Sequence, residues 1–168
     1  MQARATIEEG AMADTQIPVD EMFKRIARFK DLMPTDYGQM KGGENVPRKM
    51  QGFTVIGHVT KATPPIAADH GFTLAFNKVQ PGAGAPLHSH KIVEVFVPLS
   101  GKWKFFWGEN GEGEAELDPW DTISFPAGIM EGFRNIGTEE GLLLVVLGGP
   151  EVGEVSFQKR EKTEAATA

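Results

Sequence analysis

Two histidines and a glutamate lie close together in the chain and could bind a metal ion. His88, His90 and Glu94 are separated by even numbers of residues, so in an extended chain their side chains point to the same side. The Cα atoms of residues at i and i+2 are about 6.6 Å apart, which allows both imidazoles to reach one ion. On an ideal strand Glu94 lies about 13 Å beyond His90, so it joins them only if the strand bends or coils. Spacing alone therefore predicts a histidine pair.

The same residues belong to a longer pattern. The chain reads Gly82-x5-His88-x-His90-x3-Glu94-x6-Gly101. This pattern is similar, position for position, to the first signature motif of the cupin superfamily. The resemblance implies that both histidines and the glutamate bind the same metal.

A second region matches the superfamily less completely. The second cupin motif runs Gly-x5-Pro-x-Gly-x2-His-x3-Asn, and Pro126, Gly128 and Asn135 occupy its matching positions. Two positions depart from the motif. Trp120 stands where the first glycine belongs, and Glu131 stands where the third histidine belongs.

The resemblance implies a fold and a kind of site. Cupins are small antiparallel double-stranded β-helix barrels, or jelly rolls, so this fold is expected for about residues 53–158. They are commonly dimeric and hold a divalent metal in the barrel mouth through three histidines and a glutamate. The superfamily includes dioxygenases, decarboxylases, isomerases, lyases and binding proteins without activity. The fold therefore does not select the reaction.

Glu131 has three interpretations. If it ligates, two neutral imidazoles and two carboxylates balance a divalent charge, and the hard oxygen donors favour Fe²⁺ or Mn²⁺, with zinc and nickel as alternatives. If it stands away from the ion, the other three residues form a two-histidine, one-carboxylate set, and Glu131 is a catalytic general base. If the metal has been lost, the barrel binds an organic ligand alone, although buried carboxylates without a cation are costly.

Short runs of β-branched and aromatic residues follow one another from Phe53 to Gln158, separated by Gly, Pro, Asn or Asp. This pattern predicts an all-β sandwich or barrel. One hairpin is expected to have Asn110-Gly111 as the positive-φ pair of its turn. The predicted strands are Phe53–Thr60, Phe72–Val79, Ile92–Leu99, Lys102–Trp107, Gly113–Leu117, Thr122–Phe125, Glu131–Ile136, Leu142–Leu147 and Glu154–Gln158.

The N-terminal part of the chain has different patterns. Apolar residues recur every three or four positions between Asp20 and Met33, which predicts one amphipathic helix with Asp20 as its cap. Residues 34–50 contain many helix- and strand-breaking residues and are expected to form a connecting arm. The predicted organisation is a flexible tail at 1–17, the helix and arm at 18–50, the barrel at 51–158 and a flexible tail at 159–168.

Apolar residues of the barrel region are candidates for the wall of a substrate pocket. Their assignment rests on alternation along each strand, and for Trp103 and Phe105 plain core packing is the alternative. The candidates are Phe76, Ile92, Phe96, Trp103, Phe105, Phe125 and Phe133.

Two of the predicted strands are apolar on both faces. The runs 92–99 and 142–147 have this composition, which is typical of strands that are buried twice. Either a second subunit or the chain's own N-terminal helix is expected to cover the outer face. A homodimer is therefore one prediction.

The composition excludes several classes of function. With 23 acidic and 17 basic residues the net charge is −6, so no positive field attracts nucleic acid. The absence of cysteine excludes a disulfide scaffold and thiolate chemistry. No run approaches the roughly 18 apolar residues of a membrane span, and the N-terminus has no apolar signal-peptide core. We therefore expect a cytoplasmic protein without nucleic-acid or membrane partners.

The leading functional hypothesis is a metal-dependent, dioxygenase-like enzyme that acts on a small apolar or aromatic substrate. An enol, phenol or diketone oxygen bound on the metal suits a pocket with few polar groups, and a spare carboxylate would remove the hydroxyl proton. The alternatives are a non-catalytic cupin that binds a small molecule, and a cupin isomerase or decarboxylase.

Overall fold

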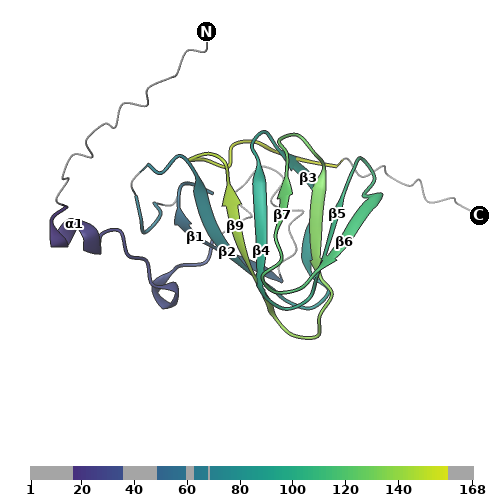
Figure 1. Cartoon of the computed structure of the whole chain (residues 1–168), viewed down its shortest axis with the longest axis horizontal. Coiled ribbons are helices and arrows are strands. Elements are labelled where there is room, and N and C mark those ends of the chain that lie inside the picture. Colours follow the sequence, from purple (N-terminus) through teal and green to yellow (C-terminus); the bar gives the residue numbers. More distant parts are fainter. Residues whose placement is uncertain (1–16, 36–48, 60–62, 68, 159–168) are drawn as a thin grey trace, which may run out of the picture.

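The structure is a computed structural model that describes residues 17–35, 49–59, 63–67 and 69–158 (Figure 1). The two tails and most of the connecting arm expected from the sequence lie outside these residues. The described part contains ten strands and only two short helical segments, which confirms the predicted all-β class. Neither helical segment in this part of the chain could span a membrane.

The strands form two antiparallel sheets of five strands each. The first, called here the β4 sheet, has the order β1 (Met50–Ile56), β2 (Thr73–Val79), β9 (Gly141–Leu147), β4 (Glu94–Ser100) and β7 (Ile123–Phe125). The second, called the β3 sheet, has the order β10 (Val155–Phe157), β3 (Gly84–His90), β8 (Glu131–Asn135), β5 (Trp103–Trp107) and β6 (Gly113–Leu117).

The two sheets pack face to face around an aromatic core. Buried and half-buried residues alternate along β2 and β9, as expected for strands with one face toward a core. Ring centroids in the core lie 5.2 to 6.3 Å apart, a range typical of favourable aromatic packing. This aromatic cluster contains Phe96, Trp103, Phe105, Phe125 and Phe133.

The single helix predicted over residues 20–33 is wrong. The segment contains a five-residue helix, α1 (Val19–Phe23), and a separate 3-10 turn, η1 (Phe29–Asp31). Pro18 precedes α1 without a side-chain cap, and Asp20 lies inside the first turn. Apolar side chains of this segment are exposed, Phe23 by 66%. A longer amphipathic helix lacks the packing surface that would stabilise it here.

The predicted strands overlap nine of the ten observed strands, with shifts of one to three residues at most ends. The exception is β3, because Gly84 and Pro86 are poor strand formers. The hairpin between β5 and β6 is present. Its positive-φ residues are Gly108 and Gly111, so Asn110 does not take the left-handed conformation assigned to it.

Candidate metal centre

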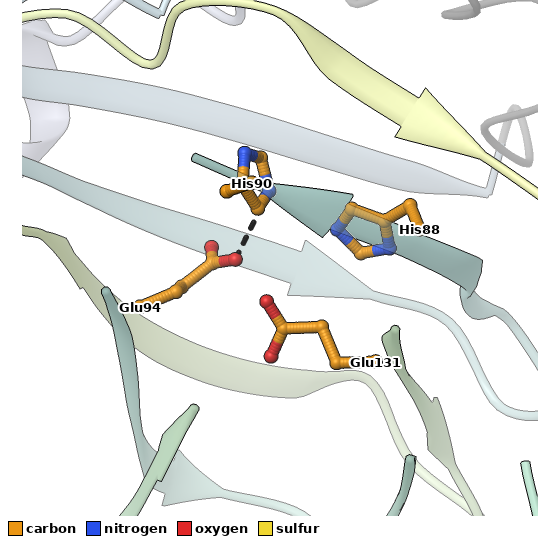
Figure 2. A group of neighbouring side chains, drawn as sticks. All are labelled: His88, His90, Glu94 and Glu131. Carbon is orange, nitrogen blue, oxygen red and sulfur yellow. Dashed lines mark ion pairs between the residues drawn. The ribbon is translucent and has the colours of Figure 1, made fainter. Parts of the chain in front are cut away.

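Four buried side chains from both sheets meet at one end of the barrel. His88 and His90 end β3, Glu131 begins β8, and Glu94 begins β4 on the facing sheet. One potential ligand atom from each lies within 4.8 Å of the others, and Figure 2 shows the four side chains gathered around a common centre. The side chains are therefore positioned to hold a metal ion.

The approach of Glu94 differs from the sequence expectation. The histidines and Glu94 do not share one strand, because the chain leaves β3 after His90 and starts β4 in the other sheet. The separation of about 13 Å between His90 and Glu94 that an ideal straight strand would impose therefore does not apply. Nε2 of His90 lies 3.1 Å from Oε2 of Glu94, as the dashed line in Figure 2 marks.

A β-bulge in β3 aims both histidines inward. Ala85 pairs with Phe133 and His88 pairs with Glu131, so three steps along β3 match two along β8. Regular alternation from Ala85 would turn both histidines outward, but the extra residue reverses the phase. Pro86, which has no N–H for a ladder, lies in this bulge.

His88 is prepared for metal binding by its neighbours. Its Nδ1 lies 2.8 Å from the carbonyl oxygen of Pro86, and a carbonyl can only accept, so Nδ1 carries the proton and Nε2 keeps its lone pair. Burial lowers the pKa of His88, which favours the neutral form that metals bind. The Phe157 ring stacks on His88 with centroids 5.7 Å apart and restricts the imidazole.

The two carboxyl groups are buried without enough partners. Glu94 is 5% exposed and Glu131 is 2% exposed. Burial, followed by the charge of Glu94, raises the pKa of Glu131 to about 10. Burial alone would raise the pKa of Glu94 as well, but the nearby His90 and His88 outweigh it and the pKa is lowered. Without a cation the pair therefore holds one proton.

Buried atoms without a hydrogen-bond partner indicate which group this site could hold. Nδ1 of His90, Oε2 of Glu94 and Oε2 of Glu131 are buried and have no hydrogen-bond partner. Such atoms are rare in folded proteins and carry a desolvation cost. A divalent cation would satisfy acceptor atoms and balance the two carboxylates, so the donor set fits a metal ion. Two imidazoles and two carboxylates do not by themselves specify which metal.

A small, mainly apolar cavity adjoins the centre, with a volume of about 70 Å³. His88, His90 and Glu94 contribute to its wall, whereas Glu131 does not. Asn77 on β2 is the other polar residue of this wall, and sequence reasoning missed it. Its signal was a polar side chain between Ala75 and Val79 at the inward-facing positions of the strand. The remaining wall residues are Met50, Val59, Ala75, Ala85, Phe133, Val145, Leu147, Val152, Val155 and Phe157.

The residues proposed for the pocket wall from sequence have four different locations. Phe133 lines the cavity. Phe96, Trp103, Phe105 and Phe125 belong to the aromatic core and are not among the wall residues. Phe76 lies on the outer face of β2, where its ring is 5.5 Å from that of Phe29. Ile92 lies between β3 and β4, half-buried against the core.

Sequence comparison assigns the central part of the barrel. Residues 75–147 match the family model described as "Cupin domain". Residues 75–147 are therefore identified as a cupin domain. The matched residues include all four side chains of the metal centre. No curated protein sequence matches the chain.

Solved structures share the cupin fold at low sequence identity. The polyketide cyclase RemF from Streptomyces resistomycificus is 20% identical with a TM-score of 0.63, and the match covers 82% of this chain and 87% of that chain. The DMSP lyase DddQ from Ruegeria pomeroyi DSS-3 is 20% identical with a TM-score of 0.60, covering 77% and 64%. An oxalate oxidase in complex with glycolate is 17% identical with a TM-score of 0.56, covering 74% and 62%.

Proposed function

We propose that this cupin is an oxygenase that holds Fe²⁺ or Mn²⁺ and acts on a small, mostly apolar substrate through an enol or diketone oxygen. The observation that supports this most is the buried four-residue donor set, in which three atoms have no hydrogen-bond partner, beside an apolar cavity. Carboxylate oxygens favour hard ions such as Mn²⁺, and a mixed set of imidazoles and carboxylates also suits Fe²⁺. When bound, such a metal supplies Lewis acidity and O₂ chemistry.

Glu131 is a fourth ligand in this proposal. A general base must reach the proton that it removes, and Glu131 is not part of the cavity wall. One of its carboxylate oxygens lies within 4.8 Å of the other donor atoms, and its buried Oε2 has no hydrogen-bond partner. Two carboxylates and two neutral imidazoles then balance the divalent charge.

The volume of the cavity limits the size of the substrate. A cavity of roughly 150 Å³ holds one benzene molecule, and this cavity has about half that volume. We therefore favour aliphatic enols and diketones, which need less room, over phenols. The oxygen-bearing end enters the cavity, where apolar walls exclude water.

The test measures metal content and oxygen uptake together. Protein purified from iron- or manganese-supplemented cells is expected to contain about one equivalent of metal and to consume O₂ faster with 2,4-pentanedione than with catechol. Glu94→Ala should lose both properties, whereas Glu116→Ala, at an exposed carboxylate of β6, should keep both. Less than about a tenth of an equivalent after reconstitution would overturn the metal assignment.

Two further outcomes separate the alternatives. Metal-loaded protein that binds small ligands but consumes no O₂ would replace the oxygenase with the non-catalytic binding protein. Glu131→Ala that keeps full metal content and loses only activity would make Glu131 a base rather than a ligand.

A further inference from the structure

The wall of the cavity beside the metal centre comes from different parts of the chain. The histidines and the glutamate in this wall lie within residues 75–147, the part that matches the cupin family model. Another group of wall residues follows β9, outside the matched part. This group, called here the C-terminal wall, consists of Val152, Val155 and Phe157. The size of the cavity is therefore set in part by residues outside the shared domain.

Phe157 lies between the cavity and the surface. It belongs to the cavity wall and is half-buried, whereas most residues of this wall are buried. Val59 is the other wall residue of intermediate exposure. It follows His58, whose carbonyl oxygen accepts the N–H of Val152 at 3.1 Å. Wall residues that also reach the surface mark the entrance, so we infer that a ligand enters past Phe157 and Val59.

The Phe157 ring also lies beside the metal centre. β10 is an edge strand of the β3 sheet, and its yellow ribbon lies beside β3 in Figure 2. Phe157 pairs with His88 across these strands, and the two rings stack with centroids 5.7 Å apart and planes inclined by 24°. A substrate that reaches a metal held by His88 is therefore expected to contact the Phe157 ring.

The backbone that carries Phe157 is held in place. Its strand is paired with β3. At the next residue, the N–H of Gln158 donates to the carbonyl oxygen of Leu87 at 3.1 Å, and the side-chain amide of Gln158 donates to the carbonyl oxygen of Glu109 at 2.8 Å. Because the surroundings of a truncated side chain relax only partially, removing the ring should leave space in this wall.

We propose that Phe157 determines the largest substrate that the cavity accepts, because its phenyl ring fills the entrance beside the metal centre. This inference rests on the proposed function, since it concerns the oxygen ligands suggested there. A cavity of roughly 150 Å³ holds one benzene molecule, and the present volume is about 70 Å³. Phe157→Ala removes a ring of that size from the wall, so it should admit ligands with an aromatic substituent.

The test compares two ligands that share a diketone group and differ in size. 1-Phenyl-1,3-butanedione has a phenyl ring where 2,4-pentanedione has a methyl group. Both are titrated without oxygen into Mn²⁺-loaded protein, and calorimetry measures the Kd of each per bound metal. In Phe157→Ala the ratio of the two Kd values should shift about tenfold or more toward the phenyl-bearing ligand.

Phe106→Ala is the matched control. It removes a half-buried phenyl ring from β5 that is not part of the cavity wall, and it should keep the wild-type ratio. Loss of packing alone would weaken both ligands together and leave the ratio unchanged. An unchanged ratio in Phe157→Ala, or an equal shift in Phe106→Ala, would overturn the proposal. A shifted ratio in a protein that consumes no O₂ would support the size limit and overturn the oxygenase.

A second measurement needs no metal. Benzene should raise the melting temperature of metal-free Phe157→Ala, because a ligand that binds the folded state stabilises it. It should not raise that of the wild type or of Phe106→Ala. The same result in a protein that binds no metal would support the size limit and overturn the metal assignment. A folded Phe157→Ala protein that does not respond to benzene would show that the wall closes where the ring was removed, and would overturn the proposal.

Discussion

Two buried polar regions of the barrel are built in opposite ways. The Asn135 side chain is fully buried and fully used: its amide nitrogen donates to the carbonyls of Val79 and Glu139 at 2.9 and 2.8 Å. Its oxygen accepts the N–H of Gly137 at 2.9 Å. The metal centre instead contains three buried atoms without a hydrogen-bond partner, of which Oε2 of Glu94 has only the ion-pair contact with Nε2 of His90 at 3.1 Å. Polar groups that stabilise the fold are satisfied within the chain, whereas unsatisfied ones indicate a ligand.

The largest expected effect is at the metal centre, whose buried atoms lack hydrogen-bond partners. His88→Ala should lower the bound metal about tenfold or more, because it removes a donor whose Nε2 is oriented by the Pro86 carbonyl. The exposed His58 lies outside the metal centre, and His58→Ala should leave the bound metal unchanged. Elemental analysis of the purified proteins measures both. Equal metal in both variants would contradict the assigned donor set.

Asn135→Ala tests the other region, in which the buried amide makes all of its hydrogen bonds within the chain. Its removal leaves buried carbonyls of Val79 and Glu139 unpaired, so the free energy of unfolding should fall by about 3 kcal/mol. Metal content per folded chain should not change. Asn110→Ala, in the exposed hairpin turn, should cost less than about 0.5 kcal/mol in the same urea titration. Loss of metal without loss of stability would break the comparison.

Glu131→Gln should have opposite effects on the stability of the metal-free protein and of the metal-loaded protein. In metal-free protein the folded pKa of Glu131 is raised from 4.5 to about 10. Its contribution to stability is therefore complete below about pH 4.5 and is lost as the pH rises toward 10. Between about pH 5 and 9, wild type should lose up to about 1.4 kcal/mol of stability per pH unit relative to Glu131→Gln.

Saturating Mn²⁺ supplies the control for this experiment. With the metal present the order should reverse, since ligand binding stabilises the folded state of the wild type more strongly. Thermal unfolding of both proteins across the pH range, with and without Mn²⁺, measures the difference. A pH-independent difference in the metal-free proteins would show that Glu131 is already ionised or already paired.

The smallest expected effect is at Trp120. This residue has a φ of 78°, which is the left-handed region that favours glycine, and its side chain is 76% exposed. Trp120→Gly should relieve backbone strain and raise the stability by up to about 1 kcal/mol. Trp120→Ala should bring no gain, because alanine keeps the same strain. Chemical denaturation distinguishes them, and a change in metal content would extend the metal centre to this turn.

The sequence predicts the strands well where local patterning decides them. Alternation and turn residues locate nine strands, but β3 contains Gly84 and Pro86 and is held by its neighbours β8 and β10. The prediction for the N-terminal segment 20–33 fails in the opposite sense. The apolar spacing of this segment satisfies a helix pattern, yet the described structure offers no surface that would stabilise a long helix.

The site is predictable only in part for the same reason. Spacing brings His88 and His90 together, whereas Glu94 and Glu131 meet them across strands and sheets, which only the resemblance indicated. Alternation also cannot separate a cavity wall from a packed core, as Phe133 and Phe105 show. On β2 the polar Asn77 lies on the inward face and the apolar Phe76 on the outer face. Because both faces of this sheet are mainly apolar, hydrophobicity alone does not distinguish them.

The bulge in β3 has a consequence for protein engineering. The Pro86–Leu87 step turns both imidazoles toward the interior and also supplies the carbonyl that fixes the tautomer of His88. A designer who grafts the His-x-His pair onto an uninterrupted strand after an inward alanine would obtain two histidines that face solvent. The transferable unit is therefore Ala85–His90, kink included.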